Sequence, residues 1–184
     1  MRVISGMLKG RRLTAPDGMA TRPTADRIKE SVFNILAGSI QTKRVLDLFA
    51  GTGALGIEAL SRGAASAVFV DRAKAALSAI RRNIRELGLE NCTRVIRWNI
   101  LKNLNCLTPE RDAFDLVFMD PPYETNAVSP ALAGLVSCGA LTAGARVVIE
   151  HSRREPIIQP IGRLILSDQR RFGKTLVSFM DTML

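Results

Sequence analysis

The sequence predicts an α/β protein with a mostly parallel sheet, and two stretches of its 184 residues carry this prediction. Residues 44–56, RVLDLFAGTGALG, form a short apolar run that enters a glycine cluster and then a helical pattern. Residues 115–125, DLVFMDPPYET, form a second apolar run that ends in an acid and two prolines. Such runs are typical of strands buried on both faces of a parallel sheet. Ligands bind beyond the carboxyl ends of these strands, so both stretches are expected to border one crevice.

The glycine cluster predicts a cradle for a nucleotide-type cofactor. Gly51, Gly53 and Gly56 follow the first run at once, and glycine lets the chain turn sharply with a ligand against bare backbone. Their spacing matches the dinucleotide fingerprint, with Asp71 placed as its ribose-binding acid. Asp47 favours another cofactor, because a carboxylate inside a buried apolar run is costly without partners. An acid just before the turn resembles the site of S-adenosyl-L-methionine (SAM) methyltransferases, where it faces the cationic methionine end; a turn-capping carboxylate is the alternative.

Length and charge limit the organisation of the chain. It fits one domain with a small appendage, which we divide into a hairpin and helix extension at 1–43 and a cofactor-binding domain at 44–184. Residues 1–43 hold eight Lys or Arg against three Asp or Glu, a net +5, and residues 151–184 hold six against three, a net +3. The middle has twelve against eleven, only +1 of the total +9. Basic flanks suggest a polyanionic partner, most simply nucleic acid, although basic charge also serves solubility.

Other classes of protein find little support in the composition. No apolar run approaches the length of about 20 residues that spans a bilayer, and the start lacks the apolar segment of a signal peptide, so we expect a cytoplasmic protein. Cys92, Cys106 and Cys138 show neither CxxC nor Cys/His spacing and are expected to be reduced. His151 is the one histidine. We therefore expect no metal site and no Ser-His-Asp triad, and nothing demands a partner chain, so a monomer is expected.

The first 43 residues predict a small hairpin followed by a helix. Two short apolar stretches separated by glycines within 1–14 fit a hairpin that exposes Lys9, Arg11 and Arg12. Thr24 is the expected N-cap of a helix that ends before Gly38. Arg22 and Arg27 bracket the start of this helix, where they either meet phosphate or are simply solvated.

The remaining elements follow the order of an alternating α/β chain. Asp71 ends the second strand and Asn99 follows the third, both at the crevice edge. Arg170, Arg171 and Lys174 are expected in the connection between the last two strands, where they touch RNA or keep the hairpin tip soluble. After the first strand the expected elements are a helix at 54–62, a strand at 67–70, a helix around 77–87, strands at 94–98 and 114–119, a turn at 140–144, and strands at 146–150, 161–167 and 175–180, the last two joined by 168–174.

The second motif predicts a site for an exocyclic amine. Asp120 stands at a strand end, and Pro121 and Pro122 stiffen the turn and leave carbonyls fixed in direction. Such an amine is a poor nucleophile because its lone pair is delocalised into the ring. Asp120 and the Pro121 carbonyl would accept its two hydrogens and aim the lone pair at a sulfonium methyl group. Tyr123 would stack on the base, which is worth about 1–3 kcal/mol.

Taken together, the motifs resemble one family. An acidic or amide residue followed by Pro-Pro-aromatic is the amino-methyltransferase signature, which residues 120–123 resemble. In addition, VISGMLKGRRL, TRPTADRIKESVFNIL, LDLFAGTGALGIEALSRGA and DPPY resemble the RsmD family of bacterial enzymes that methylate a guanine exocyclic amine in small-subunit (16S) ribosomal RNA. The similarity runs from near residue 2 to about residue 150. It implies a Rossmann-like SAM-dependent methyltransferase fold with a seven-stranded, mostly parallel sheet and an antiparallel last strand.

The resemblance also implies roles for individual residues. The cofactor SAM would meet Asp47, Gly51 and Gly53 at its methionine part, Asp71 at its ribose and Asn99 at its adenine, where Asn99 departs from the usual acid, with Phe49 and Arg72 beside them. Residues 120–123 would hold the guanine. The partner would be ribosomal RNA or a partly assembled small subunit, contacted by Lys9, Arg11, Arg12, Arg22, Thr24 and Arg27. The guanine must leave its pairing partner to reach the methyl group.

The expected reaction is direct in-line methyl transfer to guanine N2. Alignment of the two reactants supplies most of the acceleration, roughly 7–11 kcal/mol in well-oriented reactions. Asp120 orients the amine, and the sequence leaves open whether it also takes the proton. The alternatives are a DNA adenine-N6 methyltransferase with the same four-residue motif, a non-catalytic RNA-binding module and a nicotinamide dehydrogenase, which would leave Asp120 to Tyr123 unexplained.

Overall fold

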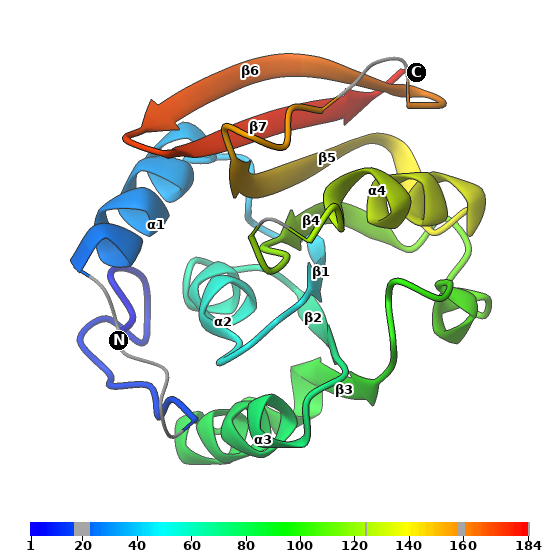
Figure 1. The fold of residues 1–184 in the computed structure, drawn as a ribbon. Coiled ribbons are helices and arrows are strands. Elements are labelled where there is room, and N and C mark those ends of the chain that lie inside the picture. Colours follow the sequence, from blue (N-terminus) through cyan, green and yellow to red (C-terminus); the bar gives the residue numbers. More distant parts are fainter. Residues whose placement is uncertain (17–22, 124, 158–160, 184) are drawn as a thin grey trace.

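A computed structural model describes residues 1–16, 23–123, 125–157 and 161–183 of the chain. Helices and strands alternate along the chain up to β5, except that only a 3-10 turn lies between β3 and β4, and after β5 two strands follow without a described helix between them (Figure 1). In chain order they are α1 (Pro23–Ile35), β1 (Arg44–Leu48), α2 (Ala54–Ser61), β2 (Ser66–Asp71), α3 (Lys74–Leu87), β3 (Thr93–Arg97), β4 (Phe114–Met119), α4 (Val128–Ser137), β5 (Leu141–Ser152), β6 (Leu164–Phe172) and β7 (Thr175–Thr182), with single 3-10 turns at Glu90–Cys92 and Asn105–Leu107.

The strands form one seven-stranded sheet in the order β3-β2-β1-β4-β5-β7-β6. β1 pairs in parallel with β2 and β4, β2 with β3, and β4 with β5. Only β7 runs against its neighbours, and it pairs antiparallel with both β5 and β6. The predicted α/β fold with a mostly parallel sheet and an antiparallel last strand is therefore confirmed.

Helices cover the two faces of the sheet unequally, and alternation along the strands decides which residues meet them. Helices α1, α2 and α3 lie on one face and α4 on the other (Figure 1). On β4, Phe118 packs with the first three helices, whereas Val117 and Met119 pack with α4. The same alternation places Val148 of β5 on the three-helix face. This face also carries the acidic strand ends that form the site.

The N-terminal segment, residues 1–14, is fastened to the helices α2 and α3. It folds back on itself as predicted, but only Arg2 and Arg12 form a β-bridge. The fully buried Glu58 of α2 accepts hydrogen bonds from the backbone N–H groups of Ile4 (2.8 Å) and Ser5 (3.0 Å). Asn83 of α3 exchanges two further hydrogen bonds with the Thr14 backbone. Side chains of α2 and α3 therefore hold the backbone of this segment in place.

Three predicted boundaries were wrong. The first helix begins at Pro23, so Thr24 lies inside it and is not its N-cap; proline at the first helical position needs no N–H partner. Residues 140–144 are not a turn, because β5 already begins at Leu141 and a register shift opposite β4 takes up the extra residues. The connection at 168–174 is shorter than predicted, since β6 continues to Phe172 and carries Arg170 and Arg171 on a strand.

Two further findings concern the described residues only. None of the helices described is long and apolar enough to cross a membrane. Cys92, Cys106 and Cys138 are free and partly buried, and burial raises the pKa of each thiol.

Candidate active site

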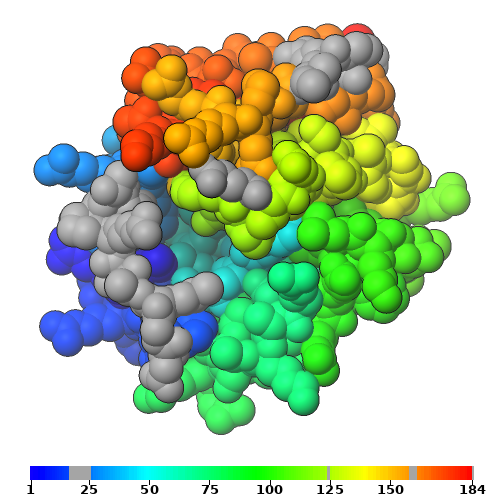
Figure 2. All heavy atoms as spheres, in the orientation of Figure 1, coloured from blue at the N-terminus to red at the C-terminus, as the bar shows by residue number. Residues whose placement is uncertain are grey.

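A cavity of about 620 Å³ opens at the carboxyl ends of β1, β2, β4 and β5. A recess is visible at the centre of the space-filling view, with residues of the β1 and α2 region (cyan) at its bottom (Figure 2). The glycine turn after β1 forms one wall and the segment after β4 forms the opposite wall. Both motifs singled out in the sequence therefore border one cavity.

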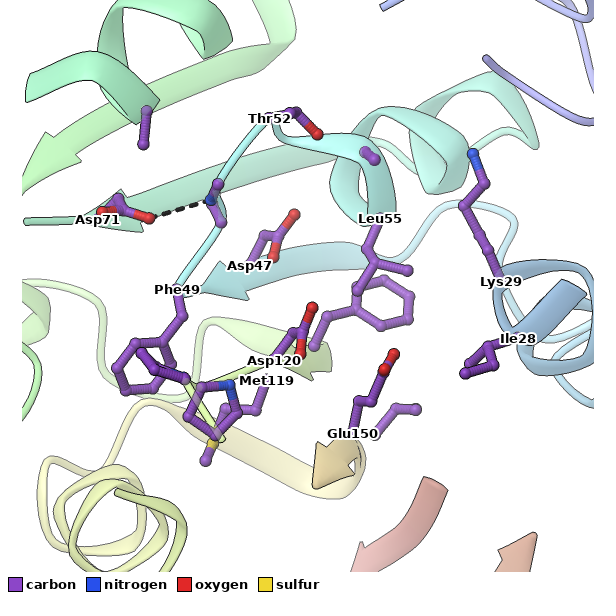
Figure 3. A pocket seen from close by; sticks show the side chains of 18 of the residues that line it. Ile28, Lys29, Asp47, Phe49, Thr52, Leu55, Asp71, Met119, Asp120 and Glu150 are labelled. Carbon is purple, nitrogen blue, oxygen red and sulfur yellow. Dashed lines mark hydrogen bonds between the residues drawn. The ribbon is translucent and has the colours of Figure 1, made fainter. Parts of the chain in front are cut away.

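The turn after β1 is held in an unusual backbone conformation. Phe49, Gly51 and Gly53 all have positive φ values, of 58°, 56° and 76°. Glycine tolerates this region, but a bulky residue such as Phe49 enters it only under strain, a feature that clusters at functional sites. The Asp71 carboxylate accepts hydrogen bonds from the N–H of Gly51 (3.0 Å) and of Ala73 (2.8 Å), so it ties the turn to the end of β2. Figure 3 shows Asp71 beside the turn.

Asp47 is a buried carboxylate at the centre of this wall. It is 2% exposed, and its Oδ2 accepts a hydrogen bond of 2.9 Å from the Gly56 N–H. Burial raises the pKa of Asp47 to about 8, against the Gly56 hydrogen bond, which lowers it, and with a smaller contribution from Asp71. A side chain at Gly56 would place Cβ 2.4 Å from the Phe69 ring. Glycine is thus required here by the close packing of α2 on β2.

The opposite wall begins with Asp120, directly after β4. Because Met119 pairs with Ile149 in parallel register, Asp120 stands level with Glu150 of β5 and shares its face of the sheet. Figure 3 shows Asp47, Asp120 and Glu150 in a row across the ends of β1, β4 and β5. Tyr123 is 43% exposed, and its hydroxyl donates a hydrogen bond of 2.5 Å to Glu150 Oε1.

Burial raises the pKa of both carboxyl groups on this wall. Asp120 is reached by solvent through the cavity mouth, yet protein atoms enclose it on most sides, and this desolvation raises its pKa, reinforced by the charges of Glu150 and Asp47. Desolvation also raises the pKa of Glu150, against the hydrogen bond from Tyr123. The pKa of the Tyr123 hydroxyl is raised by burial and by Glu150. A cationic or N–H-rich ligand would relieve all three effects.

The structure brings together most of the residues predicted for the site. Gly53 lies just behind the lining as the residue that precedes α2. Asn99 lines a neighbouring cavity of about 430 Å³, which shares Arg72 with the main one, and its Oδ1 accepts a hydrogen bond from the Leu101 N–H (3.3 Å). The predicted residues that line the main cavity are Asp47, Phe49, Gly51, Asp71, Arg72, Asp120, Pro121, Pro122 and Tyr123.

The basic residues predicted to contact RNA lie on the surface, away from the cavity lining. Lys9, Arg11, Arg12 and Arg27 are exposed. Arg11 donates a hydrogen bond of 2.9 Å to the Glu86 carbonyl. Arg22 and the side chain of Thr24 lie outside the described residues.

Sequence reasoning missed three charged residues of the cavity, Asp26, Lys29 and Glu150. Glu150 looked like an ordinary strand residue, and only the pairing of β4 with β5 reveals its position. Lys29 of α1 also lines the cavity; it is 4% exposed and lies between Glu58 Oε2 (3.3 Å) and the Arg2 carbonyl (2.6 Å). The apolar spacing of the helix gave no signal for it. Within the described ranges no three His, Cys, Asp or Glu side chains gather as metal ligands would.

The sheet order and the glycine turn after β1 define a class: this is a Rossmann-like SAM-dependent methyltransferase fold. A methyltransferase solved in complex with SAH shares the fold at a TM-score of 0.68 and 16% identity, over 90% of this chain and 52% of the other. A likeness at that identity concerns the fold alone.

The family can be stated more narrowly. Residues 1–181 match the model of the family described as conserved hypothetical protein 95, and the chain belongs to this family, the RsmD family. It is 38% identical to YlbH of Bacillus subtilis over 97% of both chains, and 36% identical to ribosomal RNA small subunit methyltransferase D of Escherichia coli over 82% of this chain and 74% of that one. A methyltransferase structure from Escherichia coli is 31% identical, covers 100% of this chain and 98% of its own, and superposes with a TM-score of 0.86. The resemblance stated from the sequence is confirmed.

Proposed function

We propose that this protein transfers a methyl group from SAM to the exocyclic N2 amine of a guanine in small-subunit ribosomal RNA. One observation carries the proposal: the buried acid Asp47 and the cavity-facing acid Asp120 stand on the same face of the sheet, on opposite walls of one cavity. The first suits a cation and the second an amine. The two reactants would therefore meet between the acids.

The residues present fit SAM. Its ammonium and sulfonium charges would compensate Asp47, whose burial is costly for an uncompensated carboxylate. The positive φ values of Gly51 and Gly53 let backbone approach the ligand closely, and Asp71 stands where it can accept hydrogen bonds from ribose hydroxyls. When bound, SAM supplies an electrophilic methyl group on a sulfonium sulfur. Asn99 and Arg72 flank the neighbouring cavity, which is the place we assign to adenine.

Asp120 and its neighbours prepare the acceptor amine. The Asp120 carboxylate would accept one N2 hydrogen and the Pro121 carbonyl the other, which turns the nitrogen lone pair toward the methyl group. No group in the described part of the chain donates a hydrogen bond to the Asp120 side chain, whereas the Pro122 carbonyl already accepts one from Thr125 Oγ1 (2.7 Å). The ring of Tyr123 supplies a stacking surface for the base. Orientation by these groups is the main catalytic contribution, because well-oriented reactions gain roughly 7–11 kcal/mol.

The relatives and the charge support ribosomal RNA as the substrate. The Escherichia coli relative is named a ribosomal RNA small subunit methyltransferase. The chain carries a net charge of +9, and Lys9, Arg11, Arg12 and Arg27 lie exposed to meet phosphates, with Arg22 and Thr24 proposed beside them. We place the reaction in the cytoplasm, with the chain acting as a monomer on ribosomal RNA or a partly assembled small subunit.

The test is methyl transfer with identification of the product. Purified protein is incubated with methyl-labelled SAM and small ribosomal subunits that lack the modification, and the labelled nucleoside is identified by mass spectrometry. Labelled N2-methylguanosine is the expected result. Label found only in N6-methyladenine of added DNA would overturn the proposal in favour of the adenine-N6 alternative, and no transfer to either acceptor would favour a binding role.

A further inference from the structure

Glu150 is a second carboxylate on the acceptor wall that the methyl transfer described above leaves without a role. It lines the cavity level with Asp120, on the neighbouring parallel strand. Neighbouring strands lie about 4.8 Å apart, so two side chains on the same face can converge on adjacent atoms of one ligand. The effect of Glu150 on the pKa of Asp120 indicates that the two carboxyl groups are close.

The orientation of Glu150 is fixed from one side. Its Oε1 accepts the Tyr123 hydroxyl hydrogen at 2.5 Å, and the same hydroxyl lies 3.2 Å from Thr175 Oγ1 of β7. A carboxylate has acceptor positions on both oxygens, so Glu150 keeps capacity for a further donor after binding Tyr123. Figure 3 shows its carboxylate directed into the cavity beside Asp120.

Two adjacent acceptors match one edge of guanine. On its Watson–Crick edge guanine presents the N1–H donor next to the N2 amine, whereas adenine presents a bare N1 lone pair next to its amine. Enzymes that act on an extruded base read this edge by hydrogen bonds. We propose that Glu150 selects guanine by accepting the N1–H hydrogen while Asp120 holds the N2 amine. This inference rests on the proposed function, and it assigns the choice of base to a residue outside the DPPY motif.

Charge explains why adenine would be rejected. An ionised Glu150 repels the N1 lone pair of adenine, and hydrogen bonds from Tyr123 and from guanine N1–H both favour its ionised form. The cavity has few cations to soften this repulsion: among its described lining residues only Lys29 and Arg72 are basic, and Lys29 is already paired with Glu58. The choice between guanine and adenine thus depends on the N1 hydrogen, which guanine carries and adenine lacks.

The experiment separates the N1 proton from the N2 amine. Reconstituted small subunits carry either guanine or 2,6-diaminopurine at the modified position; 2,6-diaminopurine keeps the 2-amino group but has no hydrogen at N1. Single-turnover methylation by the wild-type protein is expected to be about 10- to 100-fold faster on guanine, the range of one good base-reading contact. The variant Glu150→Gln keeps an oxygen for Tyr123 but turns an amide N–H toward the base. It is expected to lose this preference, with a slower rate on guanine and no loss on 2,6-diaminopurine.

Two control variants isolate the effect. Tyr123→Phe removes the hydroxyl that orients Glu150 but keeps the carboxylate, and is expected to weaken the preference for guanine without abolishing it. Glu110→Gln changes a glutamate that pairs with Arg94 far from the cavity and is expected to behave as wild type. SAM affinity and melting temperature of Glu150→Gln are measured alongside, to confirm a folded protein.

The outcomes distinguish the two proposals. Equal loss on both substrates in Glu150→Gln, or no wild-type preference for guanine, would overturn base selection by Glu150 while guanine methylation stands. Failure of the wild-type protein to methylate guanine at all would overturn the proposed function and this inference with it.

Discussion

The two walls of the cavity hold their carboxylates in different ways. On the cofactor wall, Asp47 and Asp71 accept hydrogen bonds from backbone N–H groups of Gly56, Gly51 and Ala73, all in or next to the glycine turn and the end of β2. On the acceptor wall, Glu150 is held by a side chain, and Asp120 receives no hydrogen bond from the described residues. Backbone partners cannot rotate away, so the cofactor wall is fixed in advance, whereas the acceptor wall completes its hydrogen bonding with the substrate.

Replacing Asp120 by Asn should produce the largest effect. The change turns one acceptor into a donor that opposes the N2 hydrogens, so methyl transfer should fall by about 10²–10³-fold, as when one group that acts in the transition state is lost. SAM affinity should stay within about threefold, because the cofactor wall is untouched. Single-turnover kinetics and calorimetric SAM binding on the same protein check both parts. Equal losses in rate and SAM affinity would show that the two walls are not independent.

Replacing Asp47 by Asn should weaken SAM binding and leave the acceptor wall unchanged. A neutral amide keeps an oxygen for the Gly56 N–H but loses the charge that faces the cofactor, so the dissociation constant for SAM should rise about 10- to 100-fold, the size of a hydrogen bond to a charged group. At saturating SAM the transfer rate should recover most of its wild-type value. A rate that stays low at saturation would place Asp47 in the chemical step.

The pH dependence of SAM binding follows from the same carboxyl group. The pKa of Asp47 is raised from 3.8 to about 8 in the ligand-free protein, so below pH 8 the group is mostly protonated and must lose its proton to meet a cation. SAM affinity should therefore rise from pH 6 and level off above about pH 8, with proton uptake by the buffer in calorimetry. Asp47→Asn should flatten this profile; an unchanged slope would assign it to another group.

The stability of the ligand-free protein should fall as pH rises, whereas its SAM affinity increases. Because the folded pKa of Asp47 exceeds the unfolded one, this group stabilises the fold only at low pH, and its contribution is lost as pH rises from about 4 to about 8. Saturating SAM should restore part of that loss. Urea unfolding of the wild type and of Asp47→Asn across this pH range measures the difference.

The close packing behind the cofactor wall predicts a moderate loss of stability for Gly56→Ala. The added Cβ would lie 2.4 Å from the buried Phe69 ring, an overpacking that costs about 1–3 kcal/mol of unfolding free energy. Gly134 in α4 is the matched control: its nearest neighbour is Leu104 at 3.8 Å, so Gly134→Ala should be neutral or stabilise by up to about 1 kcal/mol. Equal effects in urea unfolding would contradict the packing argument.

The smallest effect is expected for Tyr123→Phe. The ring remains available for stacking, while the hydrogen bond that orients Glu150 is lost. A neutral hydrogen bond is worth about 0.5–1.5 kcal/mol, so the rate should fall by about 2- to 10-fold. A loss as large as that of Asp120→Asn would instead indicate that the hydroxyl itself takes part in the chemistry.

The two walls also differ in how far the sequence predicts them. The cofactor wall is encoded within residues 44–71, where an acid in an apolar run and closely spaced glycines already indicate the chemistry. On the acceptor wall, Asp120 and Tyr123 belong to a recognisable motif, but Glu150 enters only through the pairing of β4 with β5. Local sequence patterns reveal functional residues that lie close together in the sequence. They miss residues such as Glu150, which reach the site only because two distant strands pair.

The boundary errors have two causes, a local one at the first helix and strand pairing at the last strands. Thr24 has good capping chemistry, but proline one residue earlier already fits the helix. Residues 140–144, which end in Gly144, looked like a turn, but pairing of Leu141 with Phe114 of β4 draws the segment into β5 instead. Likewise, β6 runs through polar residues because it pairs with β7 along its length. Strand pairing overrode local preference in both strands.

The attachment of residues 1–14 has a consequence for the order in which the chain folds. Ile4 and Ser5 bond to Glu58 across 54 and 53 positions of sequence, and Thr14 bonds to Asn83 across 69. Residues 1–14 are synthesised before α2 and α3, so they must wait for these helices to emerge from the ribosome before they can dock. Contacts of such long sequence separation close slowly. Met1 and Lys29 line the cavity, so the part of its lining that they form is complete only after the middle of the protein has been synthesised.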